Sequence, residues 1–179
     1  MSLSLSGTSG VTYPDGSVAA VAVPTGSVVQ VVSTTKTDTF TTASTSFVDV
    51  TGLSVAITPS SASNKILVLV QVNGSQDVAA NRVSLKLLRG ATEIANGDAA
   101  GSRVRAIGGF YVGDADQPSP TVNVNYLDSP STTSSTTYKI QVAIVAGAGT
   151  AFINRTDNDT DASGYPRTAS TITVMEIKG

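Results

Sequence analysis

The sequence predicts an all-β protein, a single jelly-roll-like β-sandwich with an extended N-terminal arm. Three observations lead to this prediction. About nine or ten short segments alternate apolar and polar residues, turn signals separate them, and no segment has helical periodicity. Short strands at such spacing are typical of β-sandwiches, most often jelly rolls with two packed sheets.

The predicted sandwich is organised around the run NKILVLVQVN at Asn64–Asn73, the longest apolar stretch of the chain. Successive side chains of a strand point to opposite faces. One face therefore carries Ile66, Val68, Val70 and Val72, and the other carries Leu67 and Leu69. We predict a central strand with the second sheet over one face and a further layer or a neighbouring subunit over the other. A buried helical turn is the alternative, but the length, the valine content and the preceding turn at Pro59 favour a strand.

Residues 1–24 differ in composition from the remainder and are predicted to form an arm. The segment begins with small polar residues and reaches a turn signal at Tyr13-Pro14-Asp15-Gly16, in which proline fixes one turn position and glycine accepts the left-handed one. Segments of this kind often fold on a partner, so we expect a docking arm that includes these four residues; a flexible leader is the alternative. The sandwich domain is predicted at residues 25–179.

The strands of the domain follow from alternation of apolar residues. Before the central strand we expect strands at 27–33, 46–50 and 53–57, with a turn at Thr51-Gly52 and an exposed strand and turn around Phe40. After it we expect a loop at 74–80, a hairpin turn at 89–92, and strands at 82–88, 93–95, 103–112, 122–126, 138–144, 151–153 and 171–177. Gly108-Gly109 is expected to bend or bulge its strand.

Composition excludes several classes of function. The chain has no cysteine and no histidine, so disulfides, nucleophilic cysteine, a histidine base and the usual zinc sites are absent. Charged residues make up only 13% of the chain and the net charge is −2 without a basic stripe, which argues against nucleic-acid binding. No apolar run is long enough for a membrane span, and no secretory signal is recognised. Few surface charges favour ordered assembly.

Carboxylates are the remaining catalytic option. Glu93 and Glu176 are the two glutamates, and most aspartates lie beside Gly, Pro or Asn, where a turn role is ordinary. A glycosidase would need two carboxylates about 5–10 Å apart, and the chain has no tryptophan platform, so a surface hydrolase ranks third among the functions considered. We expect no enzymatic activity, no catalytic residue and no cofactor.

The segment Asp157-Asn158-Asp159-Thr160-Asp161 has the alternating oxygens of a calcium loop. The glutamate expected at the twelfth loop position is replaced by Thr168. We therefore expect a solvated polar loop with no required ion at Asp157, Asp159 and Asp161.

Several stretches carry a resemblance to known proteins. SGTSGVTYPDGSVAAVAVPTGSVVQVV resembles the start of many tailed-phage fibre and virion proteins. ITPSSASNKILVLVQV, LKLLRGATEIA and STITVMEIKG resemble a β-module of fibre-like proteins in marine and cyanobacterial phages. The resemblance covers nearly the whole chain and includes no catalytic motif. It implies a protein on the virion surface, usually a homotrimer, whose partners are other virion proteins such as the major capsid or a tail protein.

Two functions are compatible with this resemblance. Because the sequence has an arm and one sandwich with no shaft between them, we expect a trimeric capsid decoration (cement) protein docked through its arm. The alternative is a short tail-fibre or receptor-binding tip. In that case the loops Asp114–Pro120, Asp128–Thr136 and Asn154–Thr168 would contact host surface glycans.

Overall fold

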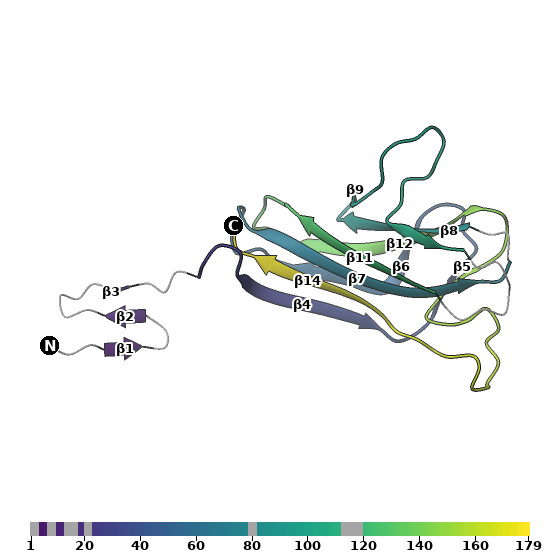
Figure 1. Ribbon diagram of the computed structural model, residues 1–179, viewed down its shortest axis with the longest axis horizontal. Coiled ribbons are helices and arrows are strands. Elements are labelled where there is room, and N and C mark those ends of the chain that lie inside the picture. Colours follow the sequence, from purple (N-terminus) through teal and green to yellow (C-terminus); the bar gives the residue numbers. More distant parts are fainter. Residues whose placement is uncertain (1–3, 7–9, 13–17, 20–22, 79–81, 112–119) are drawn as a thin grey trace.

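The computed structural model describes residues 4–6, 10–12, 18–19, 23–78, 82–111 and 120–179 (Figure 1). Within them the chain forms strands and turns and no helix. The strands are β1 (Ser4–Ser6), β2 (Gly10–Thr12), β3 (Val18–Ala19), β4 (Val28–Lys36), β5 (Phe40–Thr42), β6 (Val48–Ile57), β7 (Lys65–Gln76), β8 (Arg82–Arg89), β9 (Thr92–Ile94), β10 (Gly108–Phe110), β11 (Thr121–Asp128), β12 (Thr136–Ala146), β13 (Ala151–Ile153) and β14 (Ser170–Ile177).

The strands after β3 form two antiparallel sheets packed face to face, which confirms the predicted β-sandwich (Figure 1). The first sheet has the order β4-β14-β7-β11, and β13 and β5 extend it along the last residues of β7. The second sheet has the order β10-β8-β12-β6, with β9 paired to β8. In chain order the strands of these two four-stranded sets alternate between the sheets, except that β8 and β10 both belong to the second sheet. The last strand, β14, pairs with the first strand of the sandwich, β4. This is the jelly-roll topology that the sequence predicts.

The core lies between the sheets and is built from the inward faces of alternating strands. β7 is central: β14 pairs one of its edges and β11 pairs the other. Its inward residues Ile66, Val68, Val70 and Val72 are at most 4% exposed. Tyr138 is the largest fully buried side chain of the second sheet. The alternation read from the sequence thus identifies the core face.

The turn predicted at Gly52 and the first residues of the loop predicted at 74–80 are instead parts of strands. Gly52 lies inside the continuous strand β6, where its φ of +83° accompanies a shift in the pairing of β6 with β12. A bulge therefore replaces the predicted turn. Gly74 also continues a strand, β7, because β13 pairs with residues 74–76. A side chain at Gly74 would lie within 2.7 Å of the Phe110 ring and the Phe152 carbonyl.

The predicted strand at 103–112 is mostly wrong. In its described part, residues 103–111, only Gly108–Phe110 forms a strand, β10, and residues 103–107 belong to a loop that projects from the second sheet. Val104 is 46% exposed, so its apolar side chain does not join the core face. The hairpin turn at 89–92 is confirmed, since Arg89 pairs with Thr92.

The arm strands β1, β2 and β3 pair with one another in a sheet of their own (Figure 1). The chain enters the sandwich at residues 25–27, where Gly26 N donates to Lys178 O and Lys178 N donates to Ser27 O. We call this end of the sandwich, where β4 begins and β14 ends, the arm end, and the opposite end the far end. No helix long and apolar enough to span a membrane occurs in the described part of the chain.

Candidate assembly surface

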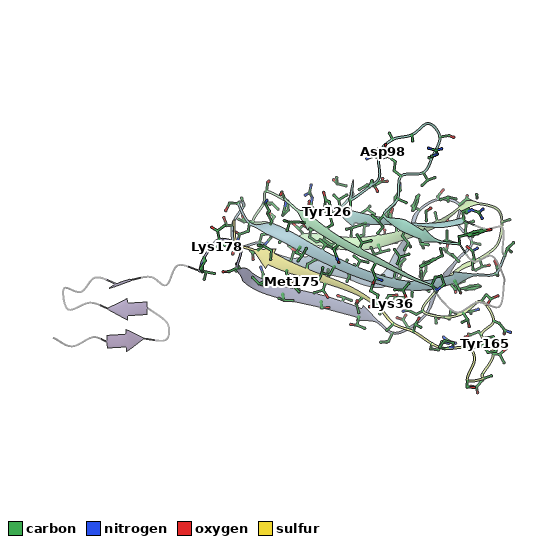
Figure 2. All side chains as sticks on the ribbon, viewed as in Figure 1. Lys36, Asp98, Tyr126, Tyr165, Met175 and Lys178 are labelled. Carbon is green, nitrogen blue, oxygen red and sulfur yellow. The ribbon has the colours of Figure 1, made fainter. Side chains whose placement is uncertain are left out.

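An apolar row crosses the outer face of the first sheet at the arm end. The strand register places Val31, Met175, Leu67 and Leu127 side by side on β4, β14, β7 and β11. Val31 is 55% exposed and Leu127 is 48% exposed. No described element covers this face. We call these four residues the apolar row; Figure 2 shows Met175 toward the arm end.

The next rows toward the far end are increasingly polar. The second row contains Ser33, Thr173, Leu69 and Asn125, and the third contains Thr35, Thr171, Gln71 and Asn123. Among the described residues of this face on β4, β14, β7 and β11, only Lys65 is charged. The outer face is therefore apolar at one end, hydroxyl- and amide-rich at the other, and nearly without charge.

The outer face of the second sheet has the opposite character. Lys139 pairs with Asp49 at 2.7 Å, and Lys86 pairs with Glu93. Ion pairs of this kind keep a sheet surface solvated and oppose its burial. A large uncovered apolar patch, by contrast, marks a surface that another molecule covers. The difference between the two faces identifies the first sheet as the candidate assembly surface.

A small hollow adjoins this surface at the base of the arm. It has a volume of about 240 Å³ and is lined by Val23, Val29, the Ser60–Asn64 turn and the C-terminal residues Lys178 and Gly179. Val23 and Val29 are 45% and 42% exposed. The apolar surface thus continues from the sheet to the point where the arm leaves the sandwich.

The buried carboxylate of Glu176 fixes the structure beneath this hollow. Oε1 accepts hydrogen bonds from Ser60 N (2.7 Å), Ser60 Oγ (2.8 Å) and Asn64 Nδ2, and Oε2 accepts one from Gln30 Nε2 at 2.6 Å. Asn64 Oδ1 in turn accepts from Gly179 N. Burial alone would raise the pKa of Glu176, but these hydrogen bonds outweigh it and lower the pKa to about 2. The charged form therefore joins β4, β14 and the Ser60 turn.

A second buried carboxylate, Asp128, links the two sheets at the same end. Arg89 NH1 contacts both oxygens of Asp128, at 2.8 and 2.9 Å, and Tyr138 OH donates to Oδ2 at 2.7 Å. Asp128 belongs to the first sheet, whereas Arg89 and Tyr138 belong to the second. Burial, together with the charge of Asp128, raises the pKa of the Tyr138 hydroxyl. Asp128 and Glu176 flank Ile66 in the sheet register, so both carboxylates stiffen the arm end.

The far end is organised by Asn154, which is fully buried and has a φ of +65°. Its Nδ2 donates to Lys36 O at 2.8 Å and to Asp38 O at 2.9 Å, and its Oδ1 accepts from Ser170 Oγ at 2.6 Å. Its backbone O accepts from Thr168 N. Asn154 therefore closes the neck of the loop that runs from residue 155 to residue 169.

The three loops considered for glycan contact do not form one surface. Asp128–Thr136 connects β11 to β12 at the arm end, whereas Asn154–Thr168 lies at the far end, where Figure 2 shows Tyr165. The third loop falls mainly on residues 112–119, outside the described residues. The predicted docking residues Tyr13, Pro14, Asp15 and Gly16 also lie outside them.

In the candidate calcium loop, Asp159 is held by two arginines. Arg167 NH2 lies 2.6 Å from its Oδ2 and Arg155 NH1 lies 3.5 Å from it. No group of three or more carboxylates suited to a metal ion is found among the described residues. The carboxylate of Asp159 thus has two arginine partners.

Sequence reasoning missed most of the surface. It identified the exposed apolar face of β7 through Leu67 and Leu69, but Val31, Leu127 and Met175 join that face only through the register of distant strands. Glu176 had a signal that could have been used: in Ser170–Ile177 it occupies the same face as the buried Ile172 and Val174. A charged residue at an inward position of a strand is expected to have buried hydrogen-bond partners.

Comparisons with known proteins give similarity in structure only. No protein-family model and no curated protein matches the sequence. Among solved structures, the chain is similar to the infectious bursal disease virus VP2 subviral particle, with 13% identity, 96% of this chain and 45% of that chain covered, and a TM-score of 0.44. It is also similar to T=1 particles derived from the same virus, with 14% identity, 99% of this chain and 44% of that chain covered, and a TM-score of 0.43. A third similar structure is that of the Gx strain of the virus, with 13% identity, 83% of this chain and 42% of that chain covered, and a TM-score of 0.40. The chain spans less than half of each of those chains, and nothing about its function follows from similarity at this level.

Proposed function

We propose that this chain is a non-enzymatic structural protein of a virion, a decoration (cement) protein that assembles through the outer face of its first sheet. The observation that carries the proposal is the apolar row on a face with Lys65 as its only charge among described residues. The sequence resemblance to tailed-phage virion proteins supports the same conclusion. A cement protein stabilises a shell because it binds the assembled form and not the dissociated subunits.

The proposed assembly is a homotrimer. The apolar row ends at β4 on one side and at β11 on the other, so copies placed around an axis would bury Val31 and Leu127 against their neighbours. Hydrophobic burial is the main driving force of such association, and the lack of charge on this face removes the cost of desolvating ions. The choice of three copies rests on the family resemblance.

The arm is proposed to dock the trimer on the particle, with Tyr13–Gly16 in its turn. Two features support this. The described arm strands pair only with one another, and the hollow at the arm base continues the apolar surface toward them. We expect a chain without residues 1–24 to remain folded and to lose binding to particles. Unfolding of the truncated chain would instead assign the arm to the core.

The experiment that tests assembly uses matched pairs of charges on the same strands. In the double variant Val31→Lys, Leu127→Lys, two charges enter the apolar row. In the control Thr35→Lys, Asn123→Lys, the same charges enter the polar third row of the same face. Light scattering should show a trimer for the wild type and the control and a monomer for the apolar-row variant. A wild-type monomer at micromolar concentration refutes the trimer, and assembly of the apolar-row variant refutes the proposed face.

The loop at 155–169 favours a second candidate function, a receptor-binding tip. Asn154 and the two arginines on Asp159 hold this loop at the far end, away from the arm, where it could contact a host surface glycan. Adsorption separates the two functions. Particles lacking a cement protein lose thermal or osmotic resistance and still adsorb to cells, whereas particles lacking a tip remain stable and fail to adsorb.

A further inference from the structure

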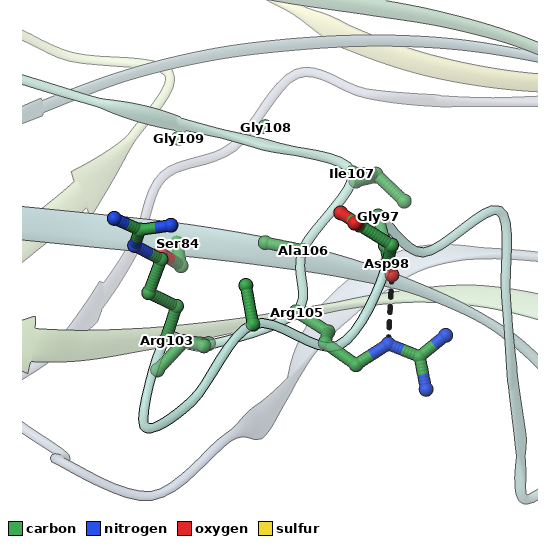
Figure 3. Close-up of a pocket in the computed structure, with 11 residues that line it drawn as sticks. Ser84, Gly97, Asp98, Arg103, Arg105, Ala106, Ile107, Gly108 and Gly109 are labelled. Carbon is green, nitrogen blue, oxygen red and sulfur yellow. Dashed lines mark hydrogen bonds between the residues drawn. The ribbon is translucent and has the colours of Figure 1, made fainter.

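A groove on the outer face of the second sheet has the features of a ligand site. It has a volume of about 450 Å³ and lies between the loop at 97–107 and the strands β8 and β10 (Figure 3). Its floor is made of small residues, Ser84, Gly108 and Gly109. The volume falls in the range of small-molecule sites, about 300–1,000 Å³.

The loop above this floor is held in place by its own hydrogen bonds. Arg105 Nε donates to Gly97 O at 2.7 Å and closes the loop at its neck. Ile107 N donates to Leu85 O at 3.0 Å and fixes the loop to β8. Arg103 N donates to Ala100 O, and Gly101, with a φ of +59°, supplies the left-handed residue of this turn. The groove is thus formed before a ligand arrives, which lowers the entropic cost of binding.

Two opposite charges line the groove from opposite sides. Figure 3 shows the guanidinium of Arg103 beside Ser84 and the carboxylate of Asp98 on the other side. Among the described residues, neither side chain has an ion-pair or hydrogen-bond partner. Two arginines, Arg103 and Arg105, line the groove against the single carboxylate of Asp98, so the lining carries a net positive charge in a chain of net charge −2.

These charges define the ligand that the groove fits. A guanidinium presents a fork of donors that matches a carboxylate or a phosphate with two hydrogen bonds. A carboxylate such as Asp98 accepts hydrogen bonds from hydroxyl groups. We propose that the groove binds an acidic saccharide, with its carboxylate or phosphate at Arg103 and a sugar hydroxyl at Asp98. This site is independent of the proposed assembly function, because it lies on the other sheet.

Isothermal titration calorimetry of the full chain at constant ionic strength tests the proposal, with glucuronate, inorganic phosphate and glucose as probes. We expect saturable 1:1 binding of glucuronate and at least about tenfold weaker binding of glucose, since a lost charge-assisted pair of hydrogen bonds costs about one to two factors of ten. Glucose-6-phosphate distinguishes the source of the oxyanion: tighter binding than glucuronate indicates a phosphate, and weaker binding indicates a carboxylate.

Two variants test the assigned roles. Arg103→Gln should weaken glucuronate at least about tenfold and abolish phosphate binding. Asp98→Asn removes a charge that repels both anions and replaces one hydroxyl acceptor with a donor, so it should strengthen phosphate binding more than glucuronate binding. Arg167→Gln, an exposed arginine at the far end, is the control and should change neither. Absence of saturable binding, equal binding of glucuronate by Arg103→Gln and the wild type, or tighter binding of glucose than of glucuronate would overturn the proposal.

Discussion

The sharpest test of the structure concerns Glu176, which is fully buried with neutral partners. Its carboxylate accepts four hydrogen bonds from three residues, Ser60, Asn64 and Gln30, and among the described residues no lysine or arginine pairs with it. The substitution Glu176→Gln keeps the shape of the side chain but replaces one acceptor oxygen with an NH₂ group that faces other donors. We expect it to lower the free energy of unfolding by about 2–4 kcal/mol at pH 7, since hydrogen bonds to a charged group contribute about 1.5–3 kcal/mol each.

The pH dependence follows from the lowered pKa. The pKa of Glu176 falls from the ordinary value of 4.5 to about 2 on folding. The folded state therefore binds this proton less readily than the unfolded state, and the stabilisation is present above pH 4.5 and lost as the pH falls toward 2. At about 1.4 kcal/mol per pH unit, the full contribution is about 3 kcal/mol, of which about 2 kcal/mol is lost by pH 3.

The assay is urea unfolding of the wild type and Glu176→Gln at pH 7 and pH 3. The difference in unfolding free energy between them should shrink by about 2 kcal/mol at pH 3. Glu93→Gln is the matched control, because Glu93 is exposed and its ion pair with Lys86 should contribute less than about 1 kcal/mol. A difference that is the same at both pH values, or a fully stable Glu176→Gln at pH 7, would refute the reasoning.

Three further predictions concern other polar groups. Asn154→Ala removes the donors to Lys36 O and Asp38 O and leaves alanine at a φ of +65°. We expect it to lower the free energy of unfolding, measured by thermal unfolding, by about 3 kcal/mol or more. The exposed control Asn158→Ala should lower it by less than about 0.5 kcal/mol. Tyr138→Phe removes the donor to Asp128 and should cost about 1–2 kcal/mol; ultraviolet titration should show that the Tyr138 hydroxyl resists ionisation beyond the pH at which exposed tyrosines ionise. Millimolar calcium should leave the melting temperature unchanged because arginines occupy Asp159, and a rise that Asp159→Ala abolishes would show an ion site.

The strands that alternate cleanly could be read from the sequence, and the reason is local. Val122, Val124 and Tyr126 alternate with asparagines, and β11 covers them as one strand. The turn prediction at Gly52 is wrong because a glycine in the left-handed conformation occurs in β-bulges as well as in turns. Gly52 is such a bulge within β6. A different limit applies at Gly74, where pairing with β13, far along the chain, decides that the strand continues.

The assembly surface could be predicted only in part, because it depends on pairing between distant residues. The two apolar faces of β7 show that one face needs a further cover, and this follows from Leu67 and Leu69 alone. That Val31 and Leu127 lie beside them depends on the order β4-β14-β7-β11. The partners of Glu176 are likewise separated from it by up to 146 positions. Sequence pattern indicates that such groups need partners, and the topology alone identifies them.

The two proposed surfaces lie on opposite sides of the sandwich, and this makes their independence testable. The apolar row belongs to the outer face of the first sheet, and the groove at Arg103 belongs to the outer face of the second, with the core between them. Substitutions at distant sites without shared partners have additive effects. We therefore expect Val31→Lys, Leu127→Lys to abolish the proposed trimer and leave glucuronate binding unchanged, and Arg103→Gln to weaken glucuronate binding at least about tenfold and leave the proposed trimer intact. Light scattering measures the assembly state and calorimetry measures glucuronate binding. Both are applied to the wild type, the apolar-row double variant, Arg103→Gln and the control Thr35→Lys, Asn123→Lys. Loss of glucuronate binding in the monomeric variant would mean that the groove is completed by a second copy, and the groove could then not be a site of the single chain.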